Sequence, residues 1–110
     1  MIRETINQIN AAIQNPKSLD EKQKKELLEL VSTLNTEVLE LSKTHPEHTE
    51  SITGLTEKSI LEATREKKDE ELLKSSLQSL SGSVEGFEGS HPKLVGIVNS
   101  LCHVLSNVGI

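Results

Sequence analysis

Aromatic side chains are almost missing from this 110-residue chain, which has no Trp, no Tyr and a single Phe, Phe87. Their absence removes the stacking platform on which many nucleic-acid binders rely. The net charge is −5, and the two basic runs, residues 22–25 and 65–68, are mixed with or flanked by acidic residues. A nucleic-acid site needs a concentrated basic surface, so we expect no nucleic-acid partner.

Cysteine is also scarce, since Cys102 is the only one. A single cysteine excludes an internal disulfide framework and is typical of a reducing compartment. Cys102 lies among apolar residues, so we interpret it as a small buried side chain rather than a nucleophile. No apolar run approaches the roughly 20 residues of a membrane span, and the N-terminus has no signal-peptide core. We therefore expect a cytoplasmic protein with no membrane partner.

Catalytic motifs are the third absence. The sequence has no glycine-rich phosphate loop, no HExxH, no GxSxG and no paired cysteines. We expect no enzymatic activity and no cofactor, although a site assembled from distant residues would leave no local motif.

The apolar residues that are present, 31 of them Ile, Leu or Val, repeat with helical spacing. They predict an all-α fold of four or five amphipathic helices in an antiparallel, bundle-like arrangement. The first helix should stop at Asn15-Pro16, and Ser18 with Glu21 should form a capping box for the second. In one domain over residues 1–110, the predicted helices are 2–14, 19–43, 46–67, 70–88 and 92–108.

The segment 46–67 is the weakest of these predictions. Its apolar stripe includes only Ile52, Leu55 and Ala63 as hydrophobic members, with His48 and Ser59 completing it, and Gly54 interrupts it. We expect this helix to be the least protected element of the fold.

The last third of the chain, residues 78–110, has only three charged residues. Wound as a helix, residues 93–108 place apolar side chains on one half of the circumference and uncharged polar side chains on the other. Half a circumference is more than one neighbouring helix covers, so we expect a coiled-coil-like contact that assembles a homo-oligomer, a dimer or higher. The predicted interface residues on this helix are Leu94, Val98, Leu101, Leu105 and Val108.

The segment 70–88 offers a second contact surface, opposite its leucine stripe. Ser75, Ser79, Gly82 and Gly86 recur at spacings of four, three and four, and such small residues allow close approach of another helix. Alternatively, the glycines only fray the end of this helix. Ser90, His91 and Pro92 form the predicted joint to the next helix, with Ser90 or His91 as its cap.

His45 and His48 are the sharpest candidates for chemistry. Imidazoles three residues apart at a helix start can bind one metal ion, and Glu47, Glu50 or Glu62 could add oxygen ligands. The alternative is that a histidine before a proline merely caps the helix. His91 is interpreted as a cap rather than a catalytic base. His103 is either a hydrogen-bonding residue buried at an interface or an exposed polar residue.

Five segments together resemble a small bacterial family known only as a domain of unknown function, number 4404. They are residues 18–21, 45–48, 62–66, the FE-x-SHP joint at 87–92 and the LSN-x-GI end at 105–110. The resemblance implies a bacterial origin and an all-helical fold, and it brings no activity or catalytic residue. From the residues themselves, we expect a non-catalytic, self-associating interaction or scaffold module, with a possible protein partner. The alternative is a metal-binding protein that uses His45 and His48.

Overall fold

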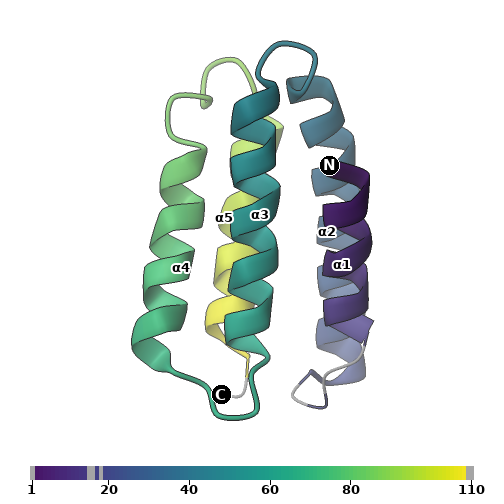
Figure 1. Ribbon diagram of the computed structural model, residues 1–110, viewed down its shortest axis with the longest axis vertical. Coiled ribbons are helices and arrows are strands. Elements are labelled where there is room, and N and C mark those ends of the chain that lie inside the picture. The colour runs from purple at the N-terminus through teal and green to yellow at the C-terminus, as the bar shows by residue number, and fades with distance from the viewer. Residues whose placement is uncertain (1, 15–16, 18, 109–110) are drawn as a thin grey trace.

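The computed structural model describes residues 2–14, 17 and 19–108. Its helices are α1 (Ile2–Gln14), α2 (Glu21–Leu41), α3 (Pro46–Ala63), α4 (Glu70–Ser83) and α5 (Pro92–Ser106). The described residues include no strand, so the predicted all-α fold is confirmed. Consecutive helices run in alternating directions along a molecule of 38 × 24 × 21 Å (Figure 1).

The five helices close into a ring in the spatial order α1, α3, α4, α5, α2. In Figure 1, α4, α3 and α1 form the layer nearer the viewer, while α5 and α2 lie behind them. Two of the neighbour pairs, α1 with α3 and α2 with α5, join helices that are not consecutive in the sequence. The core therefore depends on contacts between distant parts of the chain.

One hydrophobic cluster receives side chains from all five helices. Leucine, isoleucine and valine supply nearly all of it, as the composition predicts. Its largest fully buried members are Ile9, Ile13, Leu27, Val31, Leu34, Leu41, Ile52, Ile60, Leu80, Leu94, Leu101 and Leu105.

The third helix is predicted to be the least protected element, yet α3 contacts all four other helices. Its buried side chains include Thr49, Thr53 and Thr56. Their hydroxyl groups donate to the carbonyl oxygens of His45, Thr49 and Ile52 at 3.0, 3.0 and 2.8 Å. Each hydroxyl thus finds an acceptor on its own helix, so α3 is buried without needing a continuous apolar stripe.

The start of α2 uses a different capping box from the predicted one. Asp20 Oδ1 accepts a hydrogen bond from the Gln23 backbone N–H at 2.7 Å, and Gln23 Oε1 accepts one from Asp20 N–H at 3.2 Å. The N-cap is therefore Asp20 rather than Ser18. Ser18 and the predicted stop at Asn15-Pro16 lie outside the described residues.

Two helices end earlier than predicted. α3 ends at Ala63 instead of residue 67, because residues 65–68 are all charged and offer no apolar side chain to hold another turn against the core. α4 ends at Ser83 instead of residue 88, and Gly86 adopts a φ of 95° in the following loop. α2 and α5 stop two residues short of their predicted ends.

Lys68 links the α3–α4 loop to the residues that follow α5 through a hydrogen bond. Its Nζ donates a hydrogen bond to the carbonyl oxygen of Val108 and lies 3.6 Å from Glu70 Oε1. A lysine that reaches a carbonyl just beyond a helix C-terminus satisfies an acceptor that the helix cannot satisfy itself. This contact closes the lower end of the bundle in Figure 1.

Two glycines give a matched pair of predictions. A Cβ added at Gly54, inside α3, meets no atom within 4 Å, so Gly54→Ala should raise the free energy of unfolding by about 1 kcal/mol through helix propensity. Gly86→Ala should lower it by about 1 kcal/mol, because φ near 95° is strained for alanine. Urea denaturation of both variants measures the two changes. A loss of stability in Gly54→Ala would contradict the exposed position of this residue.

Candidate functional site

From residue 96 onward, the outward side of α5 is polar, exposed and without charge, whereas Lys93 in the first turn is exposed and charged. The part without charge consists of Gly96, Asn99, Ser100, His103, Ser106 and Asn107, which we call the uncharged face. Members recur seven residues apart, as 96 with 103, 99 with 106 and 100 with 107, so the face runs along most of the helix. In a chain in which a quarter of the residues are charged, an exposed helix face of this length with no Asp, Glu, Lys or Arg is unusual.

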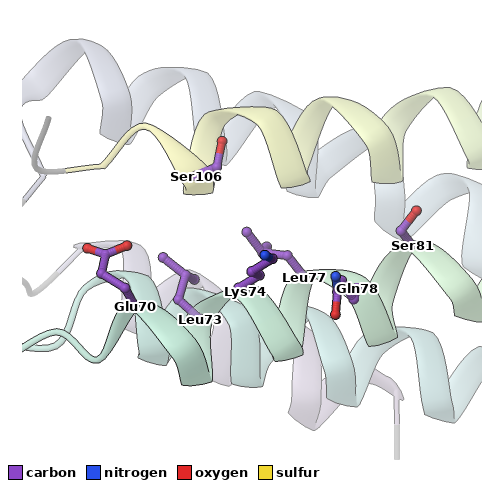
Figure 2. A pocket seen from close by; sticks show the side chains of 7 residues that line it. All are labelled: Glu70, Leu73, Lys74, Leu77, Gln78, Ser81 and Ser106. Atoms are coloured by element: carbon purple, nitrogen blue, oxygen red, sulfur yellow. The ribbon is translucent and has the colours of Figure 1, made fainter.

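Two grooves border the uncharged face. The groove between α2 and α5 has a volume of about 400 Å³ and is lined by Glu26, Leu30, Asn99, Ser100, His103 and Val104. The groove between α4 and α5, about 350 Å³, is lined by Leu73 and Leu77 together with Glu70, Lys74, Gln78, Ser81 and Ser106 (Figure 2). The helix and both grooves form one surface with apolar side chains on either flank.

The five predicted interface residues of α5 lie inside the single chain. Leu94, Val98, Leu101, Leu105 and Val108 are all buried in the core. The apolar half of α5 does exceed what one helix covers, but α2, α3 and α4 of the same chain supply the cover. An interface between copies of this fold must therefore use other residues, because these five are not exposed.

The small-residue surface predicted on the fourth helix is shorter than expected. Ser75, Ser79 and Gly82 are exposed on α4, and no atom lies within 4 Å of a Cβ added at Gly82. Gly86 lies beyond the end of the helix, so it is not part of a helical face. Among the described residues, no other helix packs closely at Gly82, and the predicted row of four small residues is broken.

Phe87 is the centre of a cluster of rings at the upper end of the bundle in Figure 1. The centroid of its ring lies 5.4 Å from those of His45 and His48 and 5.9 Å from that of His91, in edge-to-face geometry. The cluster thus joins the α2–α3 connection to the α4–α5 connection. The sequence prediction missed this role for Phe87, because nothing in its spacing shows that the two connections meet.

The structure brings His45 and His48 together, with ring centroids 5.6 Å apart and planes at 79°. The predicted oxygen ligands do not join them: among the described residues, no group of three or more His, Cys, Asp and Glu side chains is arranged to hold a metal ion. His45 is the N-cap of α3, and its side chain makes no capping hydrogen bond.

The joint at Ser90, His91 and Pro92 repeats the geometry of the α3 start. His91 is the N-cap of α5, and its φ and ψ of −137° and 63° nearly equal the −135° and 65° of His45. A proline follows each histidine in the first turn, where its lack of an N–H is harmless. Ser90 is exposed and precedes the cap.

His103 is exposed on the uncharged face, and its Nε2 lies 3.5 Å from Asn107 Nδ2. Cys102, beside that face, is half-buried, with its Sγ 3.7 Å from the carbonyl oxygen of Leu77. Burial raises the pKa of the Cys102 thiol, so little thiolate forms at neutral pH. This agrees with a packing role for the cysteine rather than a nucleophilic one.

Glu62 is a buried carboxylate that the sequence prediction treated only as a possible ligand. It is 6% exposed, and its Oε2 accepts a hydrogen bond from Arg65 at 3.0 Å. Its Oε1 and the nearby Ser59 Oγ are buried and have no hydrogen-bond partner among the described residues. A water molecule bridging two such oxygens is the usual way that proteins satisfy them.

Comparison with known proteins adds one finding. A family model described as Domain of unknown function (DUF4404) matches residues 29–110. No curated protein matches the sequence, and no solved structure matches it. Of the helices in the described part of the chain, none combines the length and hydropathy that crossing a membrane requires.

Proposed function

The chain belongs to the family described as Domain of unknown function (DUF4404), and we propose that it is a non-catalytic interaction module that self-associates through the uncharged face of α5. The observation that supports this is the combination of an exposed, charge-free helix face with an apolar groove on each side. We propose a homodimer as the assembly.

Charge favours a second copy as the occupant of this face. The chain carries a net charge of −5, so copies that meet through acidic surface repel each other. Two uncharged faces bring together no Asp, Glu, Lys or Arg side chains, and the charged residues that line the flanking grooves, Glu26, Glu70 and Lys74, are of both signs. The Asn and Ser side chains of the uncharged face both donate and accept hydrogen bonds, so the same residues can serve either copy.

The dimensions of the molecule also suit a dimer. α5 is 15 residues long, or about 22 Å at 1.5 Å per residue. The side of the molecule on which α5 and α2 lie, away from the viewer in Figure 1, has an outline of 38 by 24 Å. A specific interface buries about 800 Å² per partner, which this outline accommodates when α5 and the two grooves take part.

Light scattering on the untagged protein at tens of micromolar tests the proposal. We expect about 24 kDa, twice the chain mass of 12.1 kDa. Ser100→Glu should weaken association at least tenfold, which corresponds to about 1.4 kcal/mol, because it places like charges in the two facing copies. Ser51→Glu, at an exposed position on α3 in the opposite layer, is the matched control and should leave the mass unchanged.

A charge-reversal experiment makes the test sharper. Ser100→Lys alone should dissociate as Ser100→Glu does, and an equal mixture of the two variants should recover the mass of a dimer. A wild-type mass of 12 kDa at this concentration would refute self-association. A dimer that survives Ser100→Glu would show that the copies meet elsewhere.

A further inference from the structure

We propose that His45 and His48 form a two-imidazole site for a divalent transition-metal ion at the upper end of the bundle in Figure 1. The inference is independent of self-association, because the two histidines lie in the α2–α3 connection and the first turn of α3 rather than on α5. Both imidazoles are exposed, and their ring centroids lie 5.6 Å apart. Side chains at positions i and i+3 near a helix start can share one ion.

The hydrogen bonds of Thr44 indicate which nitrogen of His45 is free. Thr44 Oγ1 donates to the carbonyl oxygen of Leu41 at 3.4 Å and lies 2.8 Å from His45 Nδ1. The direction of the contact with His45 depends on the imidazole tautomer: with the proton on Nδ1, His45 donates to Thr44 Oγ1 and the hydroxyl proton is directed at the Leu41 carbonyl. In the neutral imidazole, Nε2 then keeps its lone pair for a metal ion. Histidine ligands typically have their other ring nitrogen held in this way by a neighbouring oxygen.

Phe87 restrains both imidazoles before an ion arrives. Its ring lies edge-to-face with each of them, with centroid distances of 5.4 Å and interplanar angles of 79° and 87°. Restraining side chains in advance reduces the rotamer entropy lost on binding. The two imidazoles are therefore held adjacent to each other before an ion binds.

The number and type of ligands define the ion. The described residues hold no group of three or more His, Cys, Asp and Glu side chains arranged around one ion, so water completes the coordination. Imidazole nitrogen suits Cu²⁺, Ni²⁺ and Zn²⁺, with Cu²⁺ bound most tightly at a given nitrogen site. Glu47, exposed in the first turn of α3, offsets the repulsion between a cation and the helix N-terminus.

Isothermal titration of the untagged protein with Cu²⁺ and with Ni²⁺ tests this site. We expect one ion per chain, with Cu²⁺ bound more tightly. His45→Gln and His48→Gln should each weaken binding at least tenfold. His91→Gln and His103→Gln are the matched controls, since each removes an imidazole outside the pair, and they should stay within twofold of the wild type.

A second variant tests the hydrogen bond that orients His45. Thr44→Val removes the oxygen next to Nδ1 and should weaken binding about tenfold without removing a ligand. Circular dichroism on every variant confirms that the helices are intact, and His48, exposed and away from the N-cap, keeps the test valid if His45→Gln fails to fold. Unchanged affinity in His48→Gln would overturn the proposal. An equal loss in His91→Gln or His103→Gln would also overturn it.

Discussion

Replacing Leu101 by aspartate is expected to leave the protein unfolded at room temperature. Leu101 is 0% exposed in the middle of α5. The substitution removes burial worth about 1.5–3 kcal/mol and places an unpaired carboxylate in the core at a cost of several kcal/mol more. Native domains are stable by about 5–15 kcal/mol, so the sum is comparable with the whole stability.

Circular dichroism and urea denaturation measure this effect. Ser51→Asp is the matched control, because it introduces the same carboxylate at an exposed helical position on α3, away from the uncharged face. That variant should keep its helical content, and its free energy of unfolding should stay within about 0.5 kcal/mol of that of the wild type. A helical Leu101→Asp protein with a wild-type midpoint would show that α5 is not packed in the core.

Phe87→Ala should lower the free energy of unfolding by about 3–5 kcal/mol, the usual cost of removing a buried phenyl ring. Phe87 is 9% exposed and contacts three histidine rings from two connections. Truncation therefore leaves a cavity and also separates the connections that Phe87 joins. Urea denaturation gives the free energy, and hydrogen exchange shows whether the first turns of α3 and α5 lose protection.

Phe87→Leu is the control for volume. Leucine keeps an apolar side chain at the centre of the cluster and loses the edge-to-face contacts, each worth about 0.5–1.5 kcal/mol. Its expected cost is smaller than that of alanine, because leucine fills most of the space that alanine leaves empty. If the alanine and leucine variants had equal stabilities, the apolar volume that Phe87 fills between the two connections would contribute nothing to the free energy of unfolding.

The helices and their buried sides were predictable wherever apolar residues define the period. α1 and α2 bury apolar residues that recur at helical spacing, such as Ile9, Ile13 and Val31, because a helix with one apolar side is stable in water only when that side is covered. The same rule failed for α3. Its buried threonines read as polar in the sequence, and a hydropathy pattern does not show that their hydroxyl groups bond to the carbonyls of the same helix.

The end of α4 was missed for the opposite reason. Val84 and Phe87 continue the heptad spacing of Leu73 and Leu80 and are buried, yet they lie beyond the helix. A loop that folds back over the core can bury residues at helical spacing by chance, and only the backbone at Gly86 reveals it. The α2 cap was predicted from Ser18 and Glu21, and the overlapping box of Asp20 and Gln23 was missed, although its residues have the same spacing.

The candidate site was harder to predict than the fold. The apolar arc of α5 showed that several neighbours were needed, but spacing alone does not tell whether they come from the same chain or from another copy. The uncharged residues on the back of the helix were visible in the sequence. The grooves beside them were not, because each lies between helices whose adjacency is a property of the ring.

Because α2 and α5 are neighbours in that ring, the order of synthesis limits when the core can form. α2 leaves the ribosome early, whereas its neighbour α5 is made some 50 residues later. Until then the side of α2 that α5 will cover stays open to water. Because burial of apolar surface is the main favourable contribution to folding, the nascent chain cannot complete its fold helix by helix. The final step is the docking of a late helix onto an early one, which makes the open side of α2 a surface that molecular chaperones can recognise before α5 arrives.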